Sequence, residues 1–327
     1  YQGDDDSYTV EYTTDGQSLN IVYSGSTKGW IPIEDDTVTY VPTTTKGIFG
    51  FGTTGSLTAV TNLVSEAGVV ATDVTGVGTV RRYLAACEYG GDKGIFGYGR
   101  AGSGGSAGSS SMTNLVSNTG VVATDTTGVG QIRFELAAAT YGGDKGIFGF
   151  GTDDSSVFSM TNLVSNAGVV GTDVTGVGTA RRYIAACEYS SDKDKAIFGF
   201  GGNYVGMTNL VSNVGVVATD VTAVGTARAR LAACSYGGDK GIFGFGEDAS
   251  ALSGVTNLVS NVGVVATDVS AVGTARHYLA ACEYGPDTAI FSYGNTGSAS
   301  SLSNLVSNVG VVASDVTGVG TARYGLA

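Results

Sequence analysis

The stretch KGIFGFG at residues 46–52 decides the fold, because it returns five more times along the chain. Later copies begin at residues 93, 145, 195 and 240, and a sixth copy, TAIFSYG, begins at residue 288. The copies align on their isoleucines, which are Ile48, Ile95, Ile147, Ile197, Ile242 and Ile290. These isoleucines follow one another in steps of 47, 52, 50, 45 and 48 residues. Such a period predicts a repeat protein in which each copy belongs to one structural unit.

Each unit contains four segments rich in Val, Ile, Thr and Tyr, which we interpret as four short strands. In the third unit they read IFGFG, MTNLVS, GVVGTDV and ARRYIAACEY. Helix caps and a 3.6-residue apolar period are missing from these segments. Four-stranded units of about 50 residues are typical of β-propeller blades. We therefore expect an all-β fold with six blades.

The aromatic-glycine strand shows how neighbouring blades could pack. Side chains alternate along a strand, so Phe49 and Phe51 should point to one face and Ile48, Gly50 and Gly52 to the other. The aromatic rings could then fill the space between blades. The glycines would let the next sheet come close on the opposite face.

The end of the chain predicts how the ring closes. The last segment, TARYGLA at 321–327, has no aromatic-glycine strand after it. We expect it to pair beside residues 46–52 and so complete a ring of six blades. In the alternative, TVTYV at 37–41 fills that place, and a seventh, composite blade is needed.

The repeat core resembles the kelch repeat. VRRYLAACEYGGDKGIFGYG at 80–99 runs from an arginine through a small apolar strand to an aromatic-glycine strand, as a kelch unit does. The resemblance covers residues 38–327 and implies a propeller of four-stranded blades. The units depart from the kelch pattern in their GFG or GYG spacing, and the only tryptophan, Trp30, lies outside them.

Residues 1–37 do not repeat, and we interpret them as an N-terminal β extension before a propeller at 38–327. Apolar and polar residues alternate there around a turn signal at Asp15-Gly16, which predicts two or three strands. The segment SLNIVYSGSTKGWIPIEDD at 18–36 resembles connector segments of tail-fibre and other structural proteins of tailed bacteriophages. This resemblance implies a virion or extracellular location and other virion proteins as partners. Because fibre proteins often form trimers, a homotrimer is one expected assembly.

Composition excludes several classes of partner. The chain has 29 acidic and 17 basic residues and a net charge of −12, so a nucleic acid is not expected to bind. No apolar run reaches the roughly 18–20 residues of a membrane span. The cysteines Cys87, Cys187, Cys234 and Cys282 end equivalent (L/I)AAC runs. Equivalent positions in successive units should lie too far apart for disulfides, so we interpret them as small buried apolar side chains.

The sequence does not favour an enzyme. The only histidine, His277, stands where Arg82 and Arg182 stand in other units, which suggests a tolerated surface substitution. A catalytic triad or a propeller copper site would need that histidine, and sialidase-like Asp boxes would need tryptophans in the repeats. We expect no cofactor or metal centre. A polysaccharide hydrolase or lyase is kept as a weaker alternative.

An aspartate, an arginine and an asparagine recur in every unit. Because an active site needs asymmetry, we interpret them as structural ion pairs or hydrogen bonds between strands or blades. The aspartates and arginines are Asp73, Arg81, Asp125, Arg133, Asp173, Arg181, Asp220, Arg228, Asp268, Arg276, Asp315 and Arg323. The asparagines of the TNLVS runs are Asn62, Asn114, Asn162, Asn209, Asn257 and Asn304.

The units differ most in the loop between their first two strands. The six loops read TTGSLTAV, RAGSGGSAGSSS, TDDSSVFS, GNYVG, EDASALSGV and NTGSASSLS. In a propeller they would lie on one face, where variable loops on a rigid frame commonly bind ligands. The side chains with most capacity for binding are Arg100, Asp153, Asp154, Phe158, Tyr204, Glu247 and Asp248. An aspartate pair there could also hold Ca²⁺.

These features predict a non-enzymatic propeller of a virion fibre, such as a phage tail fibre. Its loops would attach to a host-surface glycan or receptor. The alternative is a purely structural propeller in an extracellular or virion assembly.

Overall fold

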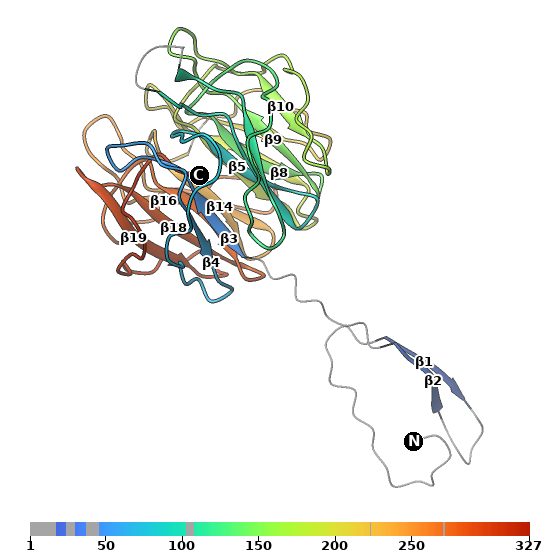
Figure 1. Cartoon of the computed structure of the whole chain (residues 1–327). Helices are drawn as coiled ribbons and strands as arrows, with labels where there is room; N and C mark the ends of the chain where they lie inside the picture. The colour runs from blue at the N-terminus through green and yellow to red at the C-terminus, as the bar shows by residue number, and fades with distance from the viewer. Residues whose placement is uncertain (1–17, 24–29, 37–45, 103–107, 223, 271) are drawn as a thin grey trace. The chain divides into compact units, whose positions relative to one another are not determined.

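The computed structural model describes residues 18–23, 30–36, 46–102, 108–222, 224–270 and 272–327. The chain divides into two compact units, residues 1–44 and 45–327. All regular structure in the described residues is β-strand (Figure 1), as the sequence predicts. No helix there is long and apolar enough to cross a bilayer.

The N-terminal unit contains one described hairpin. Strand β1 (Ser18–Tyr23) pairs antiparallel with β2 (Trp30–Asp36), with a shift in register after Asn20. The sequence predicts two or three strands here, and two are described. The segment 37–41, which would carry the seventh-blade alternative, lies outside the described residues.

The second unit contains six antiparallel sheets that repeat along the chain. The first has two strands, β3 (Gly47–Gly50) and β4 (Thr61–Val64). The other five have three strands each. These are β5 (Ala85–Tyr89), β6 (Lys93–Gly97) and β7 (Thr113–Val116); β8 (Ala137–Tyr141), β9 (Lys145–Gly149) and β10 (Thr161–Val164); β11 (Ala185–Tyr189), β12 (Lys195–Gly199) and β13 (Thr208–Val211); β14 (Ala232–Tyr236), β15 (Lys240–Gly244) and β16 (Thr256–Val259); and β17 (Ala280–Tyr284), β18 (Thr288–Asn295) and β19 (Ala299–Val306).

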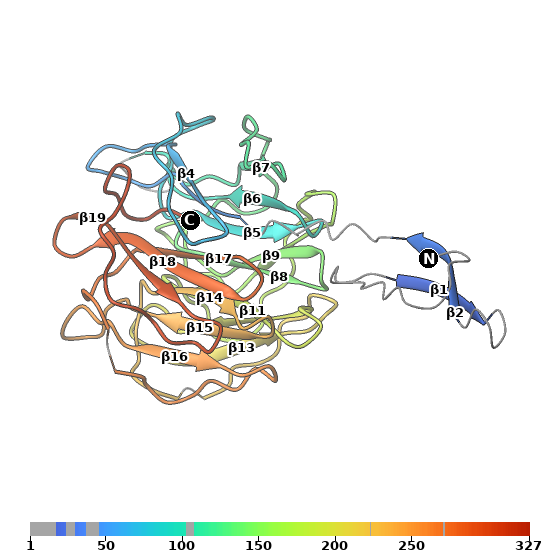
Figure 2. The ribbon, with the colours of Figure 1, turned by 90° about the horizontal axis from the view of Figure 1, so that it is seen from below.

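The LAAC segments form the inner strand of each three-stranded sheet. Strands β5, β8, β11, β14 and β17 are neighbours in that order and occupy the middle of the unit (Figure 2). We call them the inner strands. The aromatic-glycine strand lies next to each inner strand, and the TNLV strand lies outside it.

Four strands per unit is a wrong prediction, because the GVVGTDV-type segment does not form a ladder. In the third unit, residues 168–174 make only two isolated bridges to β10, Val164↔Val170 and Thr161↔Val174. Between these bridges the side-chain amide of Asn162 donates to the Gly171 carbonyl at 3.0 Å. A side chain thus occupies a position that a fourth strand would fill with backbone.

The glycines of the aromatic-glycine strands allow close sheet packing, as the sequence predicts. A Cβ added to Gly50 would lie 2.7 Å from Cζ of Phe96, a fully buried ring of the next sheet. The prediction that Phe49 and Phe51 point to the same face is wrong. Phe49 packs against Tyr293 of the last sheet, whereas Phe51 packs against Phe96, with centroids 5.6 and 5.2 Å apart. Phe51 follows β3 with a φ of +66°, which breaks the alternation.

The C-terminal residues hydrogen-bond to the first sheet. The Gly50 amide donates to the Ala327 carbonyl at 2.7 Å, and the Ala327 amide returns a bond to Gly50 at 3.2 Å. Tyr324 forms a bridge with Thr53. Residues 324–327 therefore lie beside the aromatic-glycine strand of the first unit.

The four cysteines are free thiols that pack between sheets. A Cβ on Gly146 would lie 2.5 Å from Sγ of Cys87, so the thiol fills the space that the glycine leaves. Burial raises the pKa of Cys87 to about 12, which keeps the thiol protonated. The cysteines therefore serve as small core side chains, as the sequence predicts.

Candidate functional site

Six buried arginines connect neighbouring sheets and form the frame on which the site stands. The guanidinium of Arg81 lies 4.6 Å from the ring centroid of Phe51 in the preceding sheet. Its Nη2 donates to Oδ1 of Asn114 at 2.6 Å, and Nη1 lies 3.5 Å from Asp125 Oδ1. Asn114 in turn donates to the same aspartate oxygen at 2.9 Å. We call the six buried arginines the framework arginines; they are Arg81, Arg133, Arg181, Arg228, Arg276 and Arg323.

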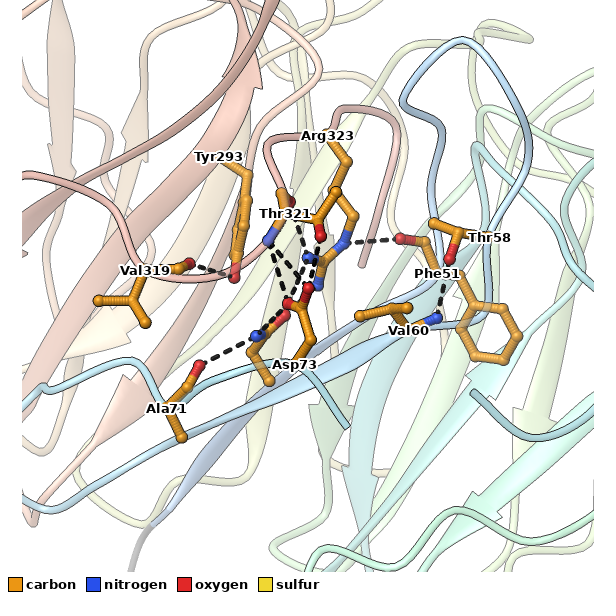
Figure 3. A network of polar contacts seen from close by, with 10 residues as sticks. Phe51, Thr58, Val60, Ala71, Asp73, Tyr293, Val319, Thr321 and Arg323 are labelled. Atoms are coloured by element: carbon orange, nitrogen blue, oxygen red, sulfur yellow. Dashed lines mark hydrogen bonds and ion pairs between the residues drawn. The ribbon is translucent and has the colours of Figure 1, made fainter. Parts of the chain in front are cut away.

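Each framework arginine pairs with the aspartate of the following repeat. The pairs are Arg81–Asp125, Arg133–Asp173, Arg181–Asp220, Arg228–Asp268, Arg276–Asp315 and Arg323–Asp73. The last pair joins the end of the chain to the first sheet (Figure 3). There the Thr321 amide and hydroxyl both donate to Asp73. Because the arrangement is the same in every unit, it holds the fold and gives no unit a special chemistry.

Two residues after each framework arginine, the backbone turns into the left-handed region. The residues there are Tyr83, Glu135, Tyr183, Arg230, Tyr278 and Gly325, with φ between +53° and +64°. The amide of each later residue donates to the carbonyl of the one before it, at 2.9 or 3.0 Å, and the Tyr83 amide donates to the Gly325 carbonyl at 2.6 Å. The six hydrogen bonds form a cycle, which we call the mouth ring. It brings together one residue from every unit, namely three tyrosines, a glutamate, an arginine and a glycine.

Tyrosine rings and guanidinium groups line the mouth ring. The Tyr278 ring centroid lies 4.9 Å from that of Tyr83 and 5.8 Å from that of Tyr183. The Arg230 guanidinium lies 4.3 Å from the Tyr183 centroid and 5.0 Å from the Tyr278 centroid. Beneath them is a cavity of about 80 Å³, whose walls also include Glu135 and the leucines that follow the ring residues. Flat aromatic faces and cations therefore meet at one opening.

Glu135 is a buried carboxyl at this opening. Its side chain is 5% exposed, and Oε2 lies 3.8 Å from Nη1 of Arg182 without a hydrogen-bond partner among the described residues. Burial raises the pKa of Glu135 to about 7, although Tyr183, Arg182 and Arg230 act in the opposite direction. The carboxyl is therefore protonated in about half of the molecules near neutral pH.

Glu247 holds a second cluster beside the mouth ring. It forms an ion pair with Arg230, accepts a hydrogen bond from Tyr204 at 3.1 Å, and lies 2.5 Å from Nδ1 of His277. The His277 ring lies 4.6 Å from the centroid of Tyr278. Burial and the nearby Arg230 lower the pKa of His277 to about 4, and Nδ1 lies in hydrogen-bond contact with the Glu247 carboxylate. The interpretation of His277 as a surface substitution is therefore wrong.

Four of the seven predicted loop residues reach this end of the molecule. Tyr204 and Glu247 belong to the cluster just described. Arg100 forms an ion pair with Asp154 at 2.8 Å, and its guanidinium lies 4.8 Å from the ring of Phe134, the neighbour of Glu135. Variable loops from several units thus meet around the mouth ring.

The other three predicted residues bond within their own loops, and Asp153 also accepts a hydrogen bond from Nε2 of Gln131 in the preceding unit at 3.1 Å. Asp153 accepts hydrogen bonds from the Ser155 and Ser156 amides, and Asp248 accepts them from Ser250 and Ala251. The backbone of Phe158 bonds to Gly151 and Arg181. These residues shape their loops.

Sequence reasoning missed the mouth ring itself. Tyr83, Glu135, Tyr183, Arg230 and Tyr278 lie in stretches that look like copies of one another. The available signal was the position two residues after each framework arginine, which holds Tyr, Glu, Tyr, Arg, Tyr and Gly in the six units. A comparison of the repeats position by position would have found these six positions, but not the hydrogen-bond cycle that joins them.

The opposite ends of the inner strands carry acidic side chains. Glu188 on β11 interacts electrostatically with Glu283 on β17 and Glu88 on β5, and Nζ of Lys193 lies 3.9 Å from Glu283 Oε2. Burial, and then the nearby Glu283, raise the pKa of Glu188 to about 9. The pKa values of Glu88 and Glu283 are raised as well, first by burial.

Because of these buried glutamates, we expect the free energy of unfolding to fall as pH rises. Glu188 has a pKa of about 9 in the folded chain and about 4.5 in an unfolded chain, so between these values the folded state binds more protons. The midpoint of urea unfolding should therefore decrease from about pH 4.5 to about pH 9. Glu188→Gln should weaken this dependence, whereas a mutant with the full wild-type slope would contradict it.

No group of three or more His, Cys, Asp and Glu side chains in the described part of the chain could hold a metal ion. The mouth ring instead offers aromatic faces for stacking, guanidinium groups for anions, and a carboxyl that is half protonated near neutrality. No protein-family model matches the chain, and no curated protein matches its sequence.

Proposed function

We propose that the six sheets form a closed, kelch-like six-bladed β-propeller. Three separate last-to-first contacts support closure: the Tyr83–Gly325 and Gly50–Ala327 backbone bonds and the Arg323–Asp73 ion pair. The aromatic contacts follow the same cycle, since Tyr293 of the last sheet packs on Phe49 of the first.

We propose that this propeller is a non-enzymatic binding module for glycans. The observation that carries the proposal is the mouth ring, where units that are otherwise near copies present three tyrosines, a glutamate, an arginine and a glycine. Tyrosines such as Tyr278 and Tyr183 combine an apolar face with a polar tip, and the guanidinium groups beside them can bind the oxygens of a ligand. The variable loops around the ring enlarge this surface, as ligand-binding loops on rigid frames commonly do.

The N-terminal segment supports a place for this module on a virion fibre. Residues 18–36 resemble connectors of phage tail-fibre proteins, and the hairpin of β1 and β2 lies in that stretch. The proposed partners are a host-surface glycan or receptor and other fibre proteins, with a homotrimer as the expected assembly. The second candidate is a purely structural propeller of the same assembly.

The test compares two loop replacements in the full chain. In one, the loops that carry Arg100 and Asp154, residues 100–112 and 152–159, are replaced by short Gly-Ser turns. In the control, residues 190–194, at the opposite end of β11, are replaced by the Gly-Gly-Asp turn found at 142–144. Binding to a glycan array and to host cells should be lost only in the first variant.

Each other outcome has a definite meaning. Unchanged binding after the mouth replacement would overturn the proposed site. If the full chain binds neither glycans nor cells, and the mouth replacement only impairs particle assembly, the structural alternative holds. Shortening of a bound polysaccharide during incubation would overturn the non-enzymatic assignment.

A further inference from the structure

Arginines outside the frame gather at the mouth ring. The chain has ten arginines, of which six are framework arginines. The remaining four are Arg82, Arg100, Arg182 and Arg230, and each lies within 5 Å of the centroid of an aromatic ring at this end. A chain with a net charge of −12 thus concentrates the guanidinium groups that lie outside the frame at one opening.

The lysines are distributed in the opposite way. Five of them lie at or near the far ends of the inner strands, and each is within ion-pair distance of a carboxylate. They are Lys93, Lys145, Lys193, Lys195 and Lys240. Arginine, which binds carboxylate and sulfate oxygens through two parallel hydrogen bonds, is the cation present at the mouth.

Part of the positive charge at the mouth has no ionised partner. Arg100 and Arg230 are paired with Asp154 and Glu247. Arg82 stacks on Tyr83 and has no carboxylate within ion-pair distance in the described part of the chain. Arg182 faces only Glu135, at 3.8 Å, and that carboxyl is largely uncharged below neutral pH. The mouth therefore has a capacity for negative charge that the described residues do not fill.

Glu135 gives a second, independent indication of a ligand. It lines the cavity beneath the ring, its side chain is 95% buried, and its Oε2 atom lacks a hydrogen-bond partner among the residues that the structure describes. A buried polar atom without a partner costs free energy, commonly about 1–3 kcal/mol. When it is protonated, this carboxyl can donate a hydrogen bond to an oxygen that enters the cavity.

We propose that the mouth ring selects sugars that carry an acidic group, a carboxylate or a sulfate, and that Glu135 takes up a proton from solvent when such a sugar binds. This inference rests on the proposed glycan-binding function and names its ligand class. Arg182 and Arg82 attract the acidic group, Glu135 donates to it, and Tyr278 and Tyr183 offer stacking surfaces for the sugar ring. No covalent bond forms or breaks except at the proton.

Binding should then weaken as pH rises above neutrality. The ionisable groups that face Glu135 are Arg182, Arg230, Tyr183, Asp154 and Tyr83, and the arginines stay charged throughout this range. An anion in the cavity favours the protonated carboxyl, so the complex binds one more proton than the free protein above about pH 7. The affinity should fall by up to about tenfold for each pH unit there.

The test uses calorimetry on the full chain with matched sugars. Sialyllactose and lactose test a carboxylate, 6-sulfolactose and lactose test a sulfate, and oligogalacturonate and its neutral methyl ester repeat the carboxylate arm on another backbone. At least one acidic member should bind at about pH 6 more than tenfold more tightly than its neutral partner, with proton uptake in buffers of different ionisation enthalpy.

Three variants separate the roles. Arg182→Gln should weaken acidic-sugar binding at least tenfold. Lys193→Gln, which removes one positive charge at the far end of β11, should leave it unchanged. Glu135→Gln cannot titrate but keeps a hydrogen-bond donor, so it should bind acidic sugars without the loss above neutral pH.

The contrary results are equally specific. Equal affinity for acidic and neutral sugars would overturn this inference and leave the glycan-binding proposal intact. Absence of binding to every sugar on the array would overturn both. Acidic-sugar binding with an unchanged pH profile in Glu135→Gln would remove Glu135 from the mechanism.

Discussion

Replacing Arg323 by alanine should lower the free energy of unfolding by about 2–5 kcal/mol, because it empties a buried site and leaves the buried Asn62 oxygen without its donor. Arg323 is fully buried, and its Nη2 donates to Oδ1 of Asn62 at 2.6 Å. Its Nε donates to the Phe51 carbonyl at 2.9 Å, and Nη1 lies 4.0 Å from Asp73 (Figure 3). These contacts join the last repeat to the first, so their loss should open the proposed ring. Urea unfolding followed by circular dichroism measures the change.

Two matched variants make the result specific. Arg181→Ala removes the corresponding bond to Asn209 and the ion pair with Asp220, at 3.3 Å, between internal units, and it should cost a similar amount. Arg323→Lys keeps the charge but cannot reach both Asn62 and Phe51 with a planar fork, so it should fall between alanine and wild type. A loss below about 1 kcal/mol for Arg323→Ala, together with a large loss for Arg181→Ala, would speak against closure through this contact.

The repeat period and the strand-forming segments could be predicted because they depend on local patterns that recur six times. The aspartate that pairs with each framework arginine could not be predicted. Asp73 precedes Arg81 by eight residues in the sequence, yet Arg81 pairs with Asp125, since the chain crosses to the next sheet between them. Spacing along the chain does not tell which sheet an arginine enters. The predicted facing of Phe51 failed for a local reason, because its left-handed φ rotates the ring toward the following sheet.

The candidate site was only half predictable. Variable loops drew attention to Arg100, Tyr204 and Glu247 because loop length and chemistry change together there. Glu135 and Arg230 were hidden in segments that otherwise repeat, and their importance depends on a cycle of backbone hydrogen bonds between different units. No sequence pattern predicts that the backbone amide of one residue donates a hydrogen bond to the carbonyl of another about 50 positions away. Burial of Glu135, which raises its pKa, also follows from that cycle and not from its neighbours in sequence.

Gly97→Ala should destabilise the protein by about 1–3 kcal/mol, the range for an atom forced into a well-packed core. The added Cβ would lie 2.6 Å from Cζ of Phe148, a ring of the next sheet that has no exposed surface and therefore no room to move. Gly94, three residues earlier on the same strand β6, is the control. Its added Cβ would meet Val116 at an ordinary 3.5 Å, and alanine already stands at the equivalent Ala196.

Gly94→Ala should therefore be neutral or slightly stabilising in the same unfolding experiment, since alanine restricts the unfolded chain more than glycine does. The last sheet supports this contrast, because Ser292 replaces the glycine there and its side chain faces the same crowded place. The aromatic pair at that junction, Tyr293 and Phe49, has its centroids 5.6 Å apart, whereas the other five pairs lie at 5.1 or 5.2 Å. One extra side chain thus coincides with a wider junction where the last sheet meets the first. If Gly97→Ala proved as stable as Gly94→Ala, a clash with the ring of Phe148 would not be the reason for a glycine at residue 97.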